Sequence, residues 1–296
     1  MSLDRIYICC HKGDFRFAQI CIASVRRHHE QIPITLLVDT YRGIFSTKTL
    51  RKQTNLTVEL SSQPIGSPFL KLLPLLKNER ERFLILDADT CLVKPLPSSI
   101  IDSESDFVVH PSTEPKAESL LQVYFDFDRL TKLDPSYKYP GYFVNTGQFI
   151  ATSGILTHDD FDPYIDWNCR PVSAKDPTLF RLVDECILNY LWTKLEFSNR
   201  FKIQLADLWH WSESIPSLNE ASLPIVHWAG ITAPSLAQMK HGDYLAQLER
   251  EFYASLPFGR LHRNISAIKF SARRYLRKIK SGLLEIAKNT RKHVQQ

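Results

Sequence analysis

The first half of the sequence alternates short apolar runs with amphipathic patterns, and this alternation restricts the fold more than any other feature. Predicted strands lie at 5–10, 33–39, 56–60 and 82–87, and predicted helices lie at 14–29 and 67–79. Strands that alternate with helices usually form a mainly parallel sheet with helices on both faces. We therefore expect an α/β fold whose ligands gather beyond the carboxyl ends of the strands.

The second half of the sequence is less regular, and its last part differs from the rest in composition. The pattern predicts a strand pair at 141–152, a helix at 176–195, a short strand at 224–230 and a closing helix at 236–256. Beyond these elements the composition becomes strongly basic. We therefore divide the chain into a large globular domain at 1–258 and a basic helical tail at 259–296.

Charge and hydrophobicity exclude several classes of protein. The net charge is +5, but eleven Lys and Arg residues oppose only Glu285 from residue 260 onward, so the body carries −5 and the tail +10. No apolar run is long enough to cross a membrane, and the start lacks a signal-peptide pattern. The six cysteines have no paired zinc-type spacing. We expect a cytoplasmic protein with reduced cysteines.

Two carboxylates follow a predicted strand in the stretch RFLILDADTCLV. Asp87 and Asp89 repel each other, and acidic side chains are rarely buried without a positive partner. A divalent cation would hold both, and the small Ala88 between them lets a ligand approach. Such an ion commonly completes its shell with water and phosphate oxygens. The pattern therefore predicts a metal site that binds a diphosphate.

Two other interpretations use the same aspartates. Phosphohydrolases of the haloacid-dehalogenase type carry Asp-x-Asp-x-Thr after an apolar strand, with Asp87 as nucleophile and Asp89 as acid/base in this numbering. Their motif usually lies on the first strand, whereas three predicted strands precede this one, and the sequence offers no convincing second pair of acidic ligands. In a purely structural alternative, the two aspartates cap a turn.

Four motifs in one order resemble glycosyltransferases of the Rossmann-like GT-A fold, closest to family 8, the glycogenin- and galactosyltransferase-like type. The resemblance covers most of residues 5–235. The motifs are SPFLKLLPLLKNERERFLILDADTCLVKPL, FVNTGQFI, DECILN and HWAGITAP. They are similar to the family's basic helix with its Asp-x-Asp strand, its Phe-Asn-x-Gly segment, its Asp-Gln-Asp-x-Leu-Asn helix and its His-x-x-Gly-x-x-Lys-Pro segment.

The resemblance implies a metal-dependent transferase that moves a sugar from a nucleotide sugar, expected to be a UDP-sugar, to a glycan or glycolipid. It implies that Asp87, Asp89 and His227 bind Mn²⁺ or Mg²⁺, a donor set that suits such ions. The implied catalytic residues are Asn145, Asp184 and Glu185. The implied donor-binding residues are Cys10, His11, Lys12, Asp14, Lys71, Ala88, Thr146, Gly147 and Gly230.

Departures from the family pattern keep other outcomes open. Glu185 stands where the family has glutamine, and a carboxylate there could act as a base or a nucleophile. Ala233 replaces the lysine that binds the diphosphate, and Lys240 or His241 is a candidate substitute. The replacement also leaves open a glycan-binding protein with a degenerate, inactive site.

The basic tail predicts an amphipathic helix. Apolar residues such as Ile268, Leu276 and Ile279 share one face, and Lys and Arg occupy the rest. Such a helix can lie on an anionic membrane surface, so residues 260–292 suggest a peripheral position at the inner membrane face. A helix packed on the body and a solvated charge run remain alternatives. We expect no nucleic-acid binding, because stacking aromatic residues are lacking beyond Tyr275.

Overall fold

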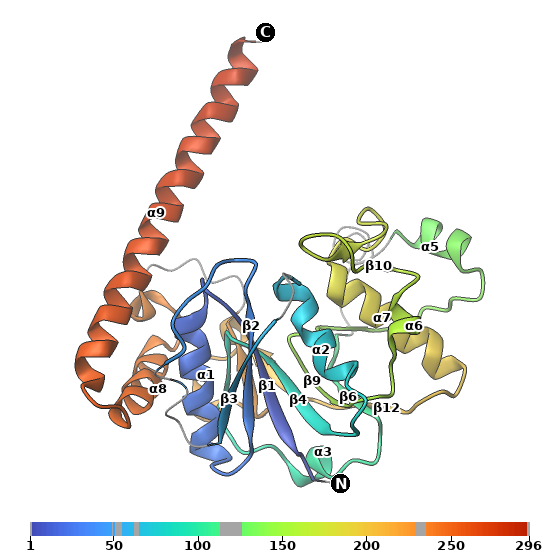
Figure 1. Ribbon diagram of the computed structural model, residues 1–296, viewed down its shortest axis with the longest axis horizontal. Coiled ribbons are helices and arrows are strands. Elements are labelled where there is room, and N and C mark those ends of the chain that lie inside the picture. Colours follow the sequence, from blue (N-terminus) through green and yellow to red (C-terminus); the bar gives the residue numbers. More distant parts are fainter. Residues whose placement is uncertain are drawn as a thin grey trace.

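The predicted apolar runs form the strands of a central sheet in the computed structural model (Figure 1). The structure describes residues 2–48, 50, 55–61, 65–112, 126–228 and 235–294. Seven described strands form this sheet: β1 (Arg5–His11), β2 (Ile34–Asp39), β3 (Leu56–Leu60), β4 (Arg82–Asp87), β6 (Phe107–Val109), β9 (Gln148–Thr152) and β12 (Ile203–Leu205).

The order of the strands is β12-β6-β9-β4-β1-β2-β3. Strands β3, β2, β1 and β4 are parallel neighbours, and β12 is parallel to β6. Only β9 among these strands runs antiparallel to its neighbours β4 and β6. The mainly parallel α/β sheet predicted from the sequence is therefore confirmed.

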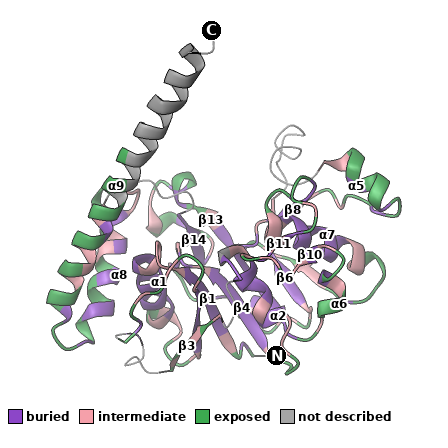
Figure 2. Ribbon diagram, turned by 45° about the horizontal axis from the view of Figure 1, so that its top comes forward, coloured by how far each residue is buried: buried purple, intermediate pink, exposed green. Residues whose placement is uncertain are grey.

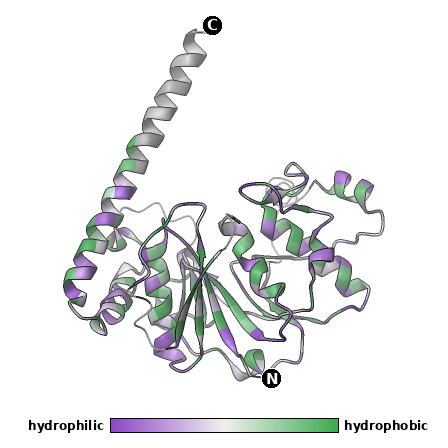
Figure 3. Cartoon of the chain, in the orientation of Figure 1, coloured by the Kyte–Doolittle hydropathy of each residue, from purple (hydrophilic) through white to green (hydrophobic). Residues whose placement is uncertain are grey.

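Both faces of the central strands are buried, which explains why these strands are mainly apolar, whereas the edge strands β3 and β12 are partly exposed (Figures 2 and 3). In β1, Ile6, Ile8 and Cys10 join one core cluster, whereas Tyr7 and Cys9 join the other. Helices α1 (Phe15–His28) and α8 (Gly242–Ala254) cover the first face, and the 3₁₀ turn η2 (Ser67–Lys71), α2 (Leu72–Leu75) and α7 (Val183–Phe197) cover the second. The alternation of side chains along the strands thus separates two cores.

A smaller sheet extends the edge at which the site lies. It contains β5 (Thr90–Leu92), β13 (Trp209–Trp211) and β14 (Ile225–His227). Strand β14 pairs antiparallel with β5 and parallel with β13. This register puts His227 opposite Thr90, immediately after the turn that follows β4.

Several predicted boundaries differ from the observed ones. The helix predicted at 67–79 consists of η2 and the one-turn α2, because Pro74 cannot continue a helical hydrogen-bond ladder. Helix α7 begins seven residues after Asp176, whose side chain instead accepts hydrogen bonds from the backbone amides of Thr178 and Leu179. The predicted closing helix is divided into η5 (Leu236–Gln238) and α8.

Short elements complete the body. They are α3 (Ser98–Ile101), β7 (Pro111–Ser112), α5 (Phe127–Leu133), β8 (Phe143–Val144), α6 (His158–Phe161), β10 (Ile165–Asp166), β11 (Ser173–Ala174), η3 (Ser212–Ser214) and η4 (Leu218–Glu220).

The basic tail forms the long helix α9 (Gly259–Val294). Its first turns pack on the body, where the Phe270 ring lies 5.5 Å from the Phe17 ring of α1, and its later turns project away (Figure 1). Of the alternatives for the tail, a helix packed on the body therefore agrees with the first half of α9. None of the helices in the described ranges combines the length and hydrophobicity that a membrane crossing requires.

Candidate active site

Backbone hydrogen bonds hold the turn between β4 and β5 in place. The amide of Asp87 donates to the carbonyl of Gly147 (2.7 Å), and the Thr90 hydroxyl donates to the carbonyl of Asp87 (2.7 Å). The amide of Trp228 donates to the carbonyl of Asp89 (2.9 Å). Two neighbouring segments, together with the Thr90 hydroxyl at the end of the turn, thus fix both aspartates at the edge of the sheet.

The three predicted metal ligands lie together. Asp87, Asp89 and His227 each offer one ligand atom, and these atoms lie within 4.8 Å of one another. The Nε2 atom of His227 lies 3.3 Å from the Asp89 carboxylate, and its Nδ1 atom is buried without a hydrogen-bond partner in the structure. The Trp211 ring stacks on His227 with a centroid distance of 4.8 Å. One ring nitrogen of His227 thus lies beside the Asp89 carboxylate, and two carboxylates with one imidazole are a donor set that suits a divalent cation.

A cleft of about 260 Å³ opens beside these ligands. Its described lining includes the predicted residues Asp14, Lys71, Asp87, Ala88, Asp89 and Asp184. It also includes Cys9, Arg42 and Pro68, which the sequence analysis did not select. The cleft lies at the carboxyl ends of β1, β2 and β4, where the sheet topology places ligands.

Lys71 joins two carboxylates at the floor of the cleft. Its ammonium group lies 3.2 Å from Asp87 and 3.2 Å from Asp184. Burial lowers the pKa of Lys71, but the two carboxylates outweigh burial and raise that pKa above its usual value. Burial raises the pKa of Asp87 to about 6, against the opposing effect of Lys71. The described lining of the cleft carries four carboxylates, with Asp14 and Asp89, against the cations Lys71 and Arg42, so negative charge is in excess.

Gly147 packs so closely against the site that no side chain fits there. An added Cβ atom would lie 2.8 Å from the side-chain oxygen of Asn145, 2.8 Å from Asp87 and 3.1 Å from His227. The Asn145 oxygen accepts a hydrogen bond from the Gly147 amide (2.9 Å). Thr146 is buried, and its hydroxyl donates to Asp184 (3.3 Å). The predicted segment 145–147 thus contacts both the metal ligands and α7.

The first turn of α7 carries the other predicted catalytic residues. Asp184 lines the cleft, whereas Glu185 contributes to the raised pKa of Lys71 but is outside the described lining of the cleft. Asn189, one turn later, holds this helix in place. Its side chain donates to the carbonyls of Glu185 (2.7 Å) and Val144 (2.8 Å) and accepts from the Val144 amide (2.8 Å).

The predicted nucleotide-binding loop is tied together by Asp14. The Asp14 carboxylate accepts hydrogen bonds from the His11 amide (2.7 Å) and the Cys10 thiol (3.4 Å). Cys10 is fully buried in the core on the α1 side of the sheet. Cys9 lines the cleft instead, and Lys12 lies on the far side of the loop beside α9.

Two positions of the fourth motif, Gly230 and Ala233, lie outside the described residues. The candidate substitutes for the missing lysine have other contacts. The Lys240 ammonium donates to the carbonyl of Glu213 (2.7 Å), and His241 Nε2 lies 3.1 Å from the carbonyl of Ile215. Neither residue belongs to the described lining of the cleft.

Some site residues were missed by the sequence analysis. Arg42 lies three residues after the carboxyl end of β2, and that position was its only signal. Trp211 belongs to a strand that was not predicted. The sequence analysis selected Cys10 instead of Cys9, because the strand pattern alone does not indicate which of two adjacent cysteines faces the cleft.

Known proteins are similar in fold rather than in sequence. No model of a protein family matches the chain, and no curated protein matches its sequence. The bifunctional glycosyltransferase WbbM in its apo form matches with a TM-score of 0.59 and 10% identity; the match covers 92% of this chain and 52% of WbbM. This chain therefore spans about half the length of WbbM.

The galactosyltransferase LgtC, solved with donor and acceptor sugar analogues, matches with a TM-score of 0.54 and 11% identity. The match covers 88% of this chain and 99% of LgtC. The overall fold of this chain is thus similar to that of solved glycosyltransferases. The chain has the GT-A fold that its sequence motifs predict.

Proposed function

We propose that the protein is a metal-dependent glycosyltransferase that moves a sugar from a nucleotide sugar, with UDP-sugar as the expected donor, to a glycan or glycolipid. The observation that carries the proposal is that the ligand atoms of Asp87, Asp89 and His227 lie within 4.8 Å of one another, with the two aspartates lining the cleft of a GT-A fold. LgtC, which has this fold, was solved with donor and acceptor sugar analogues.

The charges of the cleft support a cation and a diphosphate together. Four carboxylates in the described lining of the cleft outnumber its two cations, Lys71 and Arg42. Bound Mn²⁺ or Mg²⁺ would offset this excess and stabilise the negative charge of the departing nucleoside diphosphate. The ligands would be the two aspartates and His227.

The other predicted site residues are proposed to position the substrates. Lys71 holds Asp87 and Asp184 together, and the Asn145 side chain lies beside Gly147, outside the described lining of the cleft. Asp184 and Glu185 bring carboxylates to the start of α7, where they are proposed to orient or deprotonate the acceptor hydroxyl. The loop from Cys10 to Asp14 is proposed to hold the nucleoside.

The proposed location is the cytoplasmic face of the inner membrane. Ile268, Tyr275, Leu276 and Ile279 are exposed apolar residues of α9, with Lys269 and Arg273 nearby. An anionic surface would attract the cations and accept the apolar face. Sedimentation with phosphatidylglycerol vesicles, compared with phosphatidylcholine vesicles, tests this location.

A thermal-shift screen of nucleoside diphosphates and nucleotide sugars, each with and without Mn²⁺, tests the function. A ligand at one hundred times its dissociation constant stabilises the native state by about 2.7 kcal/mol, which raises the melting temperature by roughly 5 °C. We expect this rise only with Mn²⁺ and a matching nucleotide, and slow release of the nucleoside diphosphate from its sugar.

Two other results would contradict the proposal. Release of phosphate from p-nitrophenyl phosphate with Mg²⁺, lost in Asp87→Asn, would instead favour the phosphohydrolase. Glycan binding without Mn²⁺ dependence or turnover would favour a binding protein with a degenerate site.

A further inference from the structure

A second space adjoins the metal cleft at Arg42. It has a volume of about 370 Å³ and is lined by His11, Lys12, Gly13, Arg42 and Arg273, and we name it the cationic hollow. Arg42 also lines the metal cleft, so this side chain borders both spaces. The loop that follows β1 and supplies residues 11–13 is the one proposed to hold the nucleoside. The cleft and the hollow together are therefore the space available to one nucleoside diphosphate.

Arg42 has unused hydrogen-bond donors at the boundary between these spaces. Its side chain is exposed, and its Nε atom lies 3.8 Å from the carboxylate of Asp39, which is longer than a hydrogen bond. None of the described lining residues of the hollow is acidic. A planar guanidinium group in such surroundings fits a phosphate group, which can accept two parallel N–H groups. The position of Arg42 therefore suits the diphosphate rather than the sugar or the base.

The other described cations near the cleft already have partners. The ammonium group of Lys71 lies 3.2 Å from both Asp87 and Asp184, and the Lys240 ammonium donates to a backbone carbonyl outside the cleft. A divalent ion held by Asp87 and Asp89 has its own charge offset by these carboxylates, so a diphosphate bound to it still needs a further cation. In the described lining of the cleft, the cation that remains for this role is Arg42.

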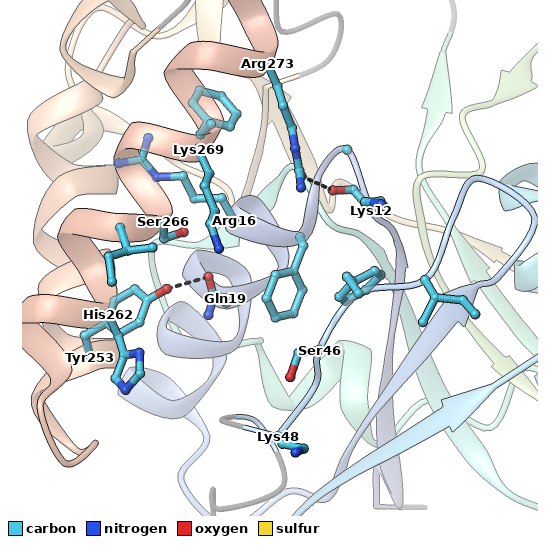
Figure 4. Close-up of a pocket in the computed structure, with 16 residues that line it drawn as sticks. Lys12, Arg16, Gln19, Ser46, Lys48, Tyr253, His262, Ser266, Lys269 and Arg273 are labelled. Atoms are coloured by element: carbon cyan, nitrogen blue, oxygen red, sulfur yellow. Dashed lines mark hydrogen bonds between the residues drawn. The ribbon is translucent and has the colours of Figure 1, made fainter.

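Helix α9 supplies the second arginine of the hollow. The Arg273 guanidinium donates to the carbonyl of Lys12 (3.2 Å), and Figure 4 shows this side chain reaching from α9 to the loop after β1. A guanidinium group has five N–H donors, so this hydrogen bond leaves others for a ligand. Arg273 therefore holds the loop in place and offers donors to the oxygen atoms of a nucleoside.

Buried contacts fix the part of α9 that carries Arg273. Phe270, one turn earlier on the helix, is buried, and its ring lies 5.5 Å from the Phe17 ring of α1. The guanidinium of Arg16 lies 5.0 Å from the same Phe270 ring and makes a buried two-pronged ion pair with Glu249 of α8 (2.6 and 2.9 Å). The first turns of α9 are thus a wall of the hollow that belongs to the packed body.

We infer that Arg42 binds the diphosphate of the donor where it leaves the metal cleft, and that Arg273 of α9 binds the nucleoside end of the same molecule. The inference rests on the proposed function, because it requires a nucleotide sugar in the cleft. Neither arginine belongs to the four motifs from which the donor site was predicted. Helix α9 is then a part of the donor site in addition to its proposed contact with the membrane.

Calorimetric titration of the full chain with UDP and with inorganic pyrophosphate, each in the presence of Mn²⁺, tests the inference. Arg42→Gln should weaken both ligands about tenfold, because both carry the phosphates that this charged donor binds. Arg273→Gln should weaken UDP about tenfold and leave pyrophosphate unchanged, because pyrophosphate has no nucleoside. Arg42→Lys, which keeps the charge but loses the planar fork, should retain part of the affinity for both ligands.

Two matched controls carry the same substitution outside the site. Arg80→Gln is the control for Arg42→Gln, because Arg80 is also exposed, with a distant carboxylate partner, Asp106 at 3.7 Å, and lies outside the described lining of both spaces. Arg260→Gln is the control on α9, because this exposed residue also lies outside that lining. Both controls should bind UDP and pyrophosphate as the wild type does.

Mn²⁺ titrated alone separates the inference from the proposed function. Arg42→Gln and Arg273→Gln should bind Mn²⁺ as the wild type does, whereas Asp89→Asn should lose both Mn²⁺ and UDP. If the wild type binds UDP with Mn²⁺ and either arginine variant binds it equally well, the inference is overturned and the proposed function stands. If the wild type binds neither UDP nor pyrophosphate with Mn²⁺, the proposed function fails and the inference fails with it.

Discussion

The metal cleft and the groove of about 530 Å³ between α1 and α9, here named the α9 groove, carry opposite charge. In the cleft, Asp87, Asp89 and Asp184 are held at the end of β4, in the turn after it and at the start of α7, and the buried Lys71 pairs with Asp87 and Asp184. In the groove, long cationic side chains reach in from exposed positions on α9 and the segment 42–48, without a described acidic residue in the lining. One region concentrates negative charge on rigid elements, and the other concentrates positive charge on flexible side chains.

This difference indicates how specific each region is. Strand ends and close backbone packing fix the carboxylates to within hydrogen-bond distances of their partners, which is what a coordinated ion requires. Lysine and arginine at a rim attract an anion but define its position less closely. Substitutions should therefore have larger effects in the cleft than in the groove.

The largest effect is expected for Asp87→Asn. Loss of one metal ligand and its charge should lower nucleotide-sugar turnover on the order of a hundredfold to a thousandfold. Turnover of a nucleotide sugar with Mn²⁺ measures it, and Asp159→Asn on the exposed face of α6 is the control. Full turnover in Asp87→Asn would remove the basis for treating the cleft as a metal site.

Lys71→Met should sharpen the contrast by removing the buried cation of the cleft and leaving Arg42 as its remaining described cation. Asp87 and Asp184 then lose the cation between them, and an uncompensated buried charge costs about 3 kcal/mol of unfolding free energy. Mn²⁺ should restore part of the loss, because it supplies positive charge at the same place. Chemical unfolding with EDTA and with Mn²⁺ measures both effects, and Lys132→Met on the surface of α5 is the control.

Equal stability of Lys71→Met and the wild type in EDTA would mean that the two carboxylates are not held together by this ammonium group. The same stability with and without Mn²⁺ in the variant would place the cation away from Asp87.

Gly147→Ala tests the close packing of the cleft. The new methyl group would meet Asn145 and Asp87 at 2.8 Å, so one of them must move, at a cost of about 2 kcal/mol. A displaced ligand should also weaken Mn²⁺ binding about tenfold. Gly141→Ala is a useful comparison, because its Cβ meets nothing within 4 Å but its φ of +88° strains any side chain. That variant should lose stability and keep its Mn²⁺ affinity.

The sequence predicted the parts of the cleft that depend on strand pattern. Asp87 and Asp89 follow a strand that is apolar because both faces of the sheet are covered, and ligands of such sheets lie at the carboxyl ends. Long-range contacts were not predictable in this way. The pairing of Lys71 with Asp184 joins residues more than one hundred positions apart, and it depends on where α7 begins.

Two smaller differences show where pattern reasoning ends. Adjacent side chains of a strand point to opposite faces, so the choice between Cys9 and Cys10 depends on a register that two identical residues cannot reveal. The tail was predicted as a helix from its periodicity, and α9 confirms the helix. Its packing against α1 through Phe270 depended on the shape of the body, which periodicity does not contain.

The smallest effect is expected for Tyr253→Phe beneath the groove. The Tyr253 hydroxyl donates to Gln19 (3.1 Å) in a buried contact between α8 and α1, and its loss should cost about 1 kcal/mol of unfolding free energy. Chemical unfolding measures the change, with Tyr41→Phe at an exposed position as the control. Mn²⁺ affinity should not change, since the contact lies outside the described lining of the cleft. A loss of Mn²⁺ affinity in Tyr253→Phe would show that the cleft and the groove are coupled through α1. Helix α1 begins directly after the segment 9–14, which contributes lining residues to both spaces.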